Sequence, residues 1–115
     1  MNDEHDPGEY DYRGCIELGV QYLDKFEPGR LDELDLDMLD LNNCTHCVLG
    51  QIGGDYRGYK EVHGFSETWC ENHGFSIPMW LLDAYFEDRI EDPMKTLTDE
   101  WKKYLRERKA QCSMS

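Results

Sequence analysis

Two short cysteine and histidine motifs contain the residues of this chain that are best suited to chemistry. The first is Cys44-x2-Cys47 and the second is Cys70-x2-His73. Three thiolates and one imidazole can hold a zinc ion in a tetrahedral site, so the motifs allow a small structural zinc protein. They also allow a purely structural role, with Cys47 and Cys70 in the core and His73 near a helix end. We favour the structural role, because cysteine is a common small core residue.

Other catalytic arrangements are not indicated by the sequence. The strand–helix context of a thioredoxin-like redox site is missing around the C-x2-C motif. Asp35, Asp37 and Asp40 lack the glycine turn and the closing glutamate of a calcium-binding loop. The sequence contains no phosphate-binding glycine loop and no His-Glu-x2-His motif. We therefore expect a protein that is not an enzyme and has no cofactor, with zinc as the alternative.

A repeated tetrapeptide marks the ends of the helices that must position these residues. His-Gly-Phe-Ser occurs at residues 63–66 and again at 73–76. In each copy the glycine can end a helix in the left-handed conformation, and the phenylalanine can pack back on its last turn. The serine can then cap the next helix, and the histidine can cap the helix that ends. The repeat predicts a helix of about two turns between the copies.

Apolar residues recur at three- and four-residue steps, as at Ile16, Val20, Leu23 and Phe26, and this spacing predicts helices and no strand along the rest of the chain. The fold class that we predict is all-α, a compact single domain of about five helices, some short, joined by Gly-Phe-Ser stop and start caps. The expected helices cover residues 15–26, 45–62 with Thr45 as its cap, 67–73, 78–90, and a last helix capped by Thr96 or Thr98, with short helical turns over 31–41. We expect the helical domain to span 13–111, after an acidic, disordered tail over 1–12. Residues 112–115 are expected to fray.

Three glycines recur at four-residue intervals in the predicted 45–62 helix, at Gly50, Gly54 and Gly58. An interior glycine costs a helix about 0.5–1 kcal/mol relative to alanine, so three of them need a reason. They indicate either a close helix crossing, within the domain or with a partner, or a break near residues 53–55. A homodimer through this glycine stripe or through residues 79–86 is also allowed.

The predicted helix over 79–86 is apolar on nearly every side, since seven of its eight residues are apolar or aromatic. Such a helix is either buried at the centre of a domain or in contact with a partner. We favour central burial, because the domain needs one helix that the others cover. The alternative is a protein-binding surface anchored by Trp80 and Tyr85.

The net charge of −13 is concentrated in the first third of the chain, where residues 1–43 have 13 acidic and 3 basic side chains. Such a field disfavours direct binding of nucleic acid or anionic membranes and attracts basic partners. An acidic surface that only keeps the protein soluble is the simpler interpretation. The acidic N-terminus does not resemble a signal peptide, and no apolar run is long enough to cross a membrane. We therefore expect a cytoplasmic protein with reduced thiols.

Several segments resemble small proteins encoded by bacteriophages of mycobacteria and other actinobacteria. They are the leucine–aspartate block 34–41, Cys47-Val48-Leu49-Gly50-Gln51-Ile52, Gly54-Asp55-Tyr56 and Gly74-Phe75. The resemblance covers residues 16–76 and the last helix. It implies a non-structural phage accessory protein that acts in the host cytoplasm. Those proteins are mostly of unassigned function, so no site residue is carried over from them.

Three functions of different classes follow from these observations. We favour a non-enzymatic module that binds and modulates a host protein, through the aromatic surface or the acidic N-terminal third. The candidate contact residues are Trp80, Tyr85, Asp35, Asp37 and Asp40. The second function is a nucleic-acid mimic, in which the carboxylates of residues 24–40 replace phosphates and occupy a DNA-binding protein. The third is the zinc-binding protein described above.

Overall fold

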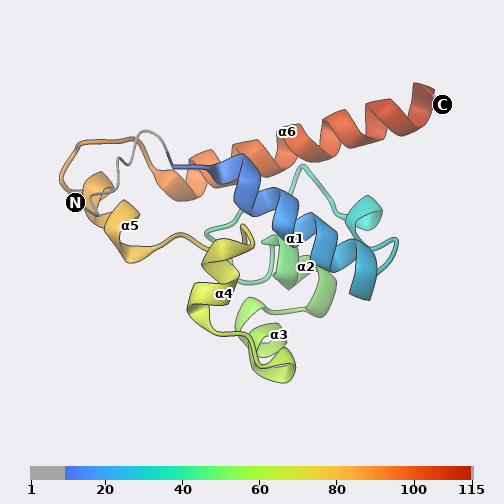
Figure 1. Cartoon of the computed structure of the whole chain (residues 1–115), viewed down its shortest axis with the longest axis horizontal. Helices are drawn as coiled ribbons and strands as arrows, with labels where there is room; N and C mark the ends of the chain where they lie inside the picture. The colour runs from blue at the N-terminus through green and yellow to red at the C-terminus, as the bar shows by residue number, and fades with distance from the viewer. Residues whose placement is uncertain (1–9, 115) are drawn as a thin grey trace.

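Six α-helices and one 3-10 turn form the part of the chain that the structure describes (Figure 1). The structure is a computed structural model, which describes the backbone of residues 10–114 and the side chains of residues 10–111. The elements are α1 (Tyr12–Phe26), η2 (Leu31–Glu33), α2 (Val48–Gly53), α3 (Tyr56–His63), α4 (Glu67–Asn72), α5 (Met79–Phe86) and α6 (Pro93–Met114). No strand occurs within residues 10–114, so the predicted all-α class is confirmed.

The helices pack in one domain around α1 and the long helix α6. The radius of gyration is 14.4 Å, close to the value of about 13 Å expected for one domain of this length. Figure 1 shows α1 running alongside α6, with α2, α3 and α4 gathered on the other side of α1 and α5 near the start of α6. None of the helices within residues 10–114 is both long and apolar enough to span a membrane.

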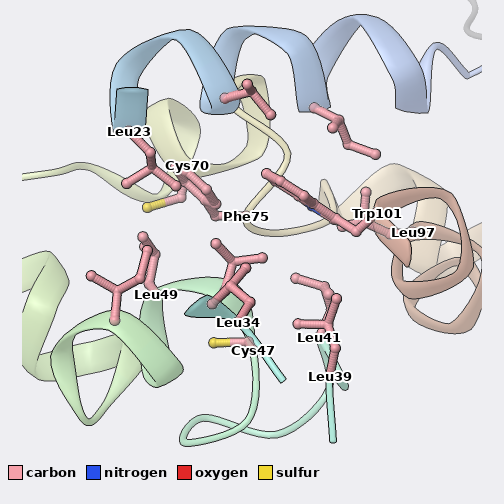
Figure 2. Close-up of a cluster of buried hydrophobic side chains, with 14 of the residues drawn as sticks. Leu23, Leu34, Leu39, Leu41, Cys47, Leu49, Cys70, Phe75, Leu97 and Trp101 are labelled. Carbon is pink, nitrogen blue, oxygen red and sulfur yellow. The ribbon is translucent and has the colours of Figure 1, made fainter. Parts of the chain in front are cut away.

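The core lies between α1, α6 and the leucine-rich segment after η2. From α1, Ile16, Val20 and Leu23 point inward as their spacing predicts, whereas Phe26 at the end of the same stripe is 58% exposed. Figure 2 shows the opposing side chains of the core. They are Leu34, Leu39, Leu41, Cys47, Leu49, Cys70, Phe75, Leu97 and Trp101.

Trp101 occupies the centre of this core and is fully buried. Its indole Nε1 donates a hydrogen bond to the Gly74 carbonyl oxygen at 2.6 Å, and its ring stacks on Phe75 with the centroids 6.0 Å apart. Gly74 itself lies against the backbone of α1, since a Cβ there would be 2.9 Å from the Ile16 Cα. One indole thus connects α6, the second His-Gly-Phe-Ser copy and α1.

The first copy of the repeat acts as predicted. Gly64 is left-handed at φ 70° and ends α3, and the Phe65 amide donates to the Lys60 carbonyl oxygen at 3.0 Å. Ser66 caps α4 by accepting from the Trp69 amide at 3.0 Å. Each of these contacts satisfies a backbone group that a helix end leaves without a partner.

The second copy agrees with the prediction only in part. Gly74 is left-handed at φ 78°, and the Phe75 amide donates to the Cys70 carbonyl oxygen at 2.9 Å. Ser76 does not cap the next helix, because its hydroxyl donates to Glu67 at 2.6 Å. Helix α5 instead follows Pro78 and has no side-chain cap.

The prediction of a single helix over 45–62 is wrong. The helix is interrupted at Gly54, which has a φ of 93° and is the C-cap of α2. Helix α2 is capped by the Cys47 side chain rather than by Thr45, and Asp55 starts α3 by accepting from the Gly58 amide at 3.0 Å. Gly50 does allow a close approach, because a Cβ there would overlap the carbonyl oxygen of Cys44. The approaching backbone is the preceding loop of the same chain, so Gly50 meets its own loop and Gly54 marks the break that was the alternative prediction.

The ends of the domain also differ from the prediction. Asp11 caps α1 by accepting from the Gly14 amide at 2.9 Å, so residues 10–12 belong to the domain and the rest of the predicted tail lies outside the described residues. Helix α6 begins at Pro93, before either predicted threonine cap, because proline suits the first turn of a helix. Thr98 instead accepts from the Leu41 amide at 2.9 Å. The backbone is helical through Met114, beyond the predicted limit at residue 111.

A matched pair of glycine substitutions tests the close approach at α2. Gly50→Ala should lower the free energy of unfolding by about 1–3 kcal/mol, since the methyl group meets the Cys44 backbone. Gly58→Ala should be neutral or stabilise by up to about 1 kcal/mol, because the nearest atom would be 3.5 Å away. Urea denaturation followed by circular dichroism measures both. Equal effects would show that the Gly50 contact does not constrain the fold.

Candidate functional site

Helix α5 lies at the edge of the domain, so the predicted central burial is wrong. Of its eight residues only Leu81 and Ala84 are buried. Among the helices it packs mainly on α6, as its position in Figure 1 shows. The central place is taken by Leu97, Trp101 and Leu105 of α6. Three of its apolar or aromatic residues, Met79, Tyr85 and Phe86, are exposed instead.

The outward side of α5 is an apolar stripe. Met79, Leu82 and Phe86 are spaced three and four residues apart, which places them on one helix face. Met79 is 65% exposed and Phe86 is 70% exposed, while Leu82 is half-buried. Tyr85, which is 36% exposed, lies beside the stripe with its ring centroid 5.6 Å from that of Phe86. These four residues are called the α5 surface below.

The predicted anchor Trp80 supports this surface more than it forms it. Its side chain is half-buried and packs against the core. Tyr10, just before α1, meets its ring edge to face at a centroid distance of 5.7 Å. Met79 and Phe86 were not among the predicted contact residues. They lie on the helix face opposite Leu81 and Ala84, so only the burial of these two residues indicates them.

The second half of α5 and the loop that follows it are acidic. Residues 83–92 contain five acidic side chains and one basic side chain, which gives a local charge of −4. The single base, Arg89, is paired with Glu87 at 3.0 Å between Nε and Oε1. Helix α5 ends at Phe86 with Glu87 as its C-cap, the next residue Asp88 turns the chain back with a φ of 62°, and the Arg89 amide donates to the Ala84 carbonyl oxygen at 2.9 Å. The apolar stripe thus has acidic residues beside and beyond its C-terminal end, which are called the acidic rim below.

The predicted aspartates do not form a single site. The Asp35 carboxylate closes a local turn by accepting from the Asp37 and Met38 amides at 3.0 and 3.3 Å. Asp37 and Asp40 line an open groove of about 670 Å³, which also contains basic side chains. One of these, Lys95, is paired with Asp99 at 3.1 Å. The groove therefore lacks the uniform negative charge of a phosphate-like surface.

The acidic run over 24–40 is also partly neutralised from α6. Arg108 makes two hydrogen bonds to the Asp24 carboxylate, at 2.8 and 2.9 Å, and its Nε lies 3.9 Å from Asp32. The two Asp24 contacts have the bidentate geometry that holds a guanidinium firmly. Nucleic-acid mimicry, which needs these carboxylates to be available to a partner, receives less support from this geometry than protein binding through α5.

The cysteine and histidine motifs have structural partners. Cys47 is buried, and its thiol accepts from the Gly50 amide at 3.3 Å. Cys70 is buried beside the Tyr56 hydroxyl, and His73 bonds through Nδ1 to the Trp69 carbonyl oxygen at 2.7 Å. Cys44 is exposed. Within the described part of the chain, no three histidine, cysteine, aspartate or glutamate residues form a metal-binding group. The expected burial of Cys47 and Cys70 is confirmed.

Glu67 is the most highly connected carboxylate near these thiols. It accepts from Lys60 and Ser76 at 2.6 Å each and from the Tyr56 hydroxyl at 3.2 Å. Partial burial alone would raise the pKa of Glu67, but these three hydrogen bonds outweigh it and lower the pKa below its usual value. Tyr56 also lines a small cavity of about 170 Å³ with Cys44 and Cys47. An ionised, fully engaged carboxylate of this kind connects α3 to α4 and is not poised to transfer a proton.

No family model, curated protein or solved structure matches the chain. The functional argument therefore depends on the geometry described above.

Substituting Glu67 tests its structural role through the pH dependence of stability. Because folding lowers the pKa of Glu67, its contribution to stability is present above the unfolded-state pKa of about 4.3 and is lost as the pH falls through the folded-state value. Glu67→Gln should therefore destabilise the protein at pH 7 and have a smaller effect near pH 3. Urea denaturation at both pH values measures this. A difference that does not change with pH would contradict the ionic role.

Alkylation of the native thiols tests the arrangement of the cysteines. Burial raises the pKa of Cys47 to about 11 and also raises the pKa of Cys70. Iodoacetamide at pH 8 should therefore modify exposed Cys44 at least about tenfold faster than either of them, as followed by peptide mass mapping. Added zinc should leave the Cys44 rate unchanged. Joint protection of Cys44, Cys47 and Cys70 by zinc would instead support the zinc-binding alternative.

Proposed function

We propose that this protein is a non-enzymatic module that binds another protein through the α5 surface. The observation that supports the proposal is the exposure of Met79 and Phe86 on a helix that buries only Leu81 and Ala84. Contiguous apolar side chains within a polar rim are typical of protein-binding sites on soluble domains. An exposed aromatic ring such as Phe86 is a suitable anchor for a pocket on the partner.

The acidic rim defines the chemistry of the partner. A complementary surface would offer an apolar groove for the stripe and basic residues for the carboxylates of residues 83–92. A second copy of this chain fits poorly, because each copy has a net charge of −13 and the two rims would repel. The resemblance to actinobacteriophage accessory proteins suggests that the partner is a host protein, which the module would bind and modulate in the host cytoplasm.

Substitutions on α5 test the proposal directly. The tagged protein is used to retain proteins from an actinobacterial lysate, with washes over a salt series and identification by mass spectrometry. We expect one partner that survives moderate salt, because apolar burial is not screened, and that is lost with Met79→Ser combined with Phe86→Ser.

Val62→Ser is the matched control, since Val62 is 81% exposed but lies on α3. It should retain the same partner. Loss of that partner in the Asp37→Asn and Asp40→Asn double variant, with retention in the α5 variant, would contradict the proposal and favour an acidic interface.

A further inference from the structure

A second exposed surface is built from aromatic rings at the junction of α1 and α4. Tyr22 of α1 is its centre, with ring centroids 4.7 Å from Phe26, 5.4 Å from Phe65 and 5.0 Å from Trp69. Phe26 is 58% exposed, and the other three rings are half-buried. These four residues are called the aromatic surface below. Their contacts show that residues from α1, the α3–α4 connection and α4 form one continuous group.

The repeat holds two of these rings, Phe65 and Trp69, in fixed positions. Trp69 lies between two stacked rings, Phe65 at 3.9 Å and His73 at 3.7 Å between centroids. His73 is itself fixed by its Nδ1 bond to the Trp69 carbonyl oxygen. The first copy repeats this arrangement, since His63 stacks on Tyr59 at 4.0 Å and bonds to the Tyr59 carbonyl oxygen. Rings that are already immobilised lose little conformational entropy when a ligand binds.

The charge around the aromatic surface is negative. The two segments that contain the rings, 17–27 and 61–73, together have six acidic side chains and one lysine. Two of the six, Asp24 and Glu67, are paired with Arg108 and Lys60, so the local charge with these two bases included is −3. Glu27 lies next to the group, where its Oε2 accepts from the Tyr59 hydroxyl at 2.9 Å. The single lysine, Lys25, places its Nζ 5.3 Å from the Phe26 ring centroid. A cation of the chain itself therefore already uses one of these ring faces.

We propose that the aromatic surface binds an arginine-bearing segment of another protein. A guanidinium group is planar, so it can stack on a ring face while its edge pairs with a carboxylate, which the compact ammonium group of lysine does less well. Nucleic acid can also stack on aromatic rings, but its phosphates would meet the negative charge of these segments. A second copy of the chain meets the same repulsion.

This site is separate from the α5 surface. Tyr10, which contacts Trp80 of α5, precedes α1, whereas Phe26 ends α1. Helix α1 therefore separates the two surfaces, and the inference does not depend on the proposed function.

Peptides that differ only in the chemistry of their cation provide the test. Fluorescently labelled octa-arginine and octa-lysine are titrated with the protein at one fixed ionic strength, and anisotropy gives the two affinities. We expect octa-arginine to bind about fivefold more tightly, the factor that one or two exposed cation–π contacts produce. Phe26→Leu, which keeps an apolar side chain but removes the ring, should reduce this ratio to nearly one, and so should Phe65→Leu.

Tyr104→Leu is the matched control, because the Tyr104 ring already has the Arg13 guanidinium 4.9 Å from its centroid. It should leave the ratio unchanged, and circular dichroism confirms that each variant is folded. Equal affinities of the two peptides for the wild-type protein would overturn the proposal, because net charge alone would then explain binding. An unchanged ratio in both Phe26→Leu and Phe65→Leu would overturn it as well.

Discussion

The close backbone contact between α1 and the second His-Gly-Phe-Ser copy determines the rest of the architecture. A Cβ at Gly19 would overlap the His73 carbonyl oxygen, and a Cβ at Gly74 would lie 2.9 Å from the Ile16 Cα on the same helix. Only glycine allows both approaches, and the left-handed conformation of Gly74 is one that other residues rarely adopt. The Trp101 indole then satisfies the Gly74 carbonyl oxygen, so that α6 is placed by the same turn. At the surface, two ion pairs join the two long helices. Arg13 of α1 pairs with Glu107 of α6, and Arg108 of α6 pairs with Asp24 of α1.

This arrangement decides which apolar side chains remain outside. With Trp101 and Phe75 at the centre, α1 and α6 already enclose the core, and α5 contributes only Leu81 and Ala84 to it. The remaining apolar residues of α5 have no interior position to occupy. At the other end of α1 the short helix α4 presents Trp69 to Tyr22, but it is too short to cover Phe26. Both the α5 surface and the aromatic surface therefore remain exposed for the same reason. Two long helices and several short ones cover Trp101 but leave these apolar side chains outside the core.

Local sequence rules predicted the fold class, the stops at Gly64 and Gly74 and the inward face of α1, because each of these depends on residues within one or two turns. They failed where distant residues compete. Whether α5 is buried depends on which helix places a tryptophan at the centre of the core. The sequence alone does not show whether Trp80 of α5 or Trp101 of α6 takes that position. The cysteine spacing was compatible with zinc or with a core, and the sequence alone did not show that Cys70 lies beside Tyr56 or that His73 bonds to the Trp69 carbonyl oxygen. The aromatic surface was not predicted, because Tyr22 and Trp69 are far apart in the sequence. The sequence does show an aromatic residue four positions before each histidine of the repeat, Tyr59 before His63 and Trp69 before His73.

The charge distribution gives the two surfaces related chemistry. An acidic chain is attracted to basic partners over a distance of about one Debye length, but this attraction is screened by salt and shows little discrimination. Specificity then has to come from short-range contacts, and the structure offers two kinds. The flexible, apolar Met79 and Leu82 suit an apolar groove, whereas the immobilised rings around Trp69 suit a planar cation. Because the segments that form both surfaces also contain acidic side chains, a basic partner with an apolar anchor and a nearby arginine could contact both, and its affinity would then depend on the spacing that α1 sets between them.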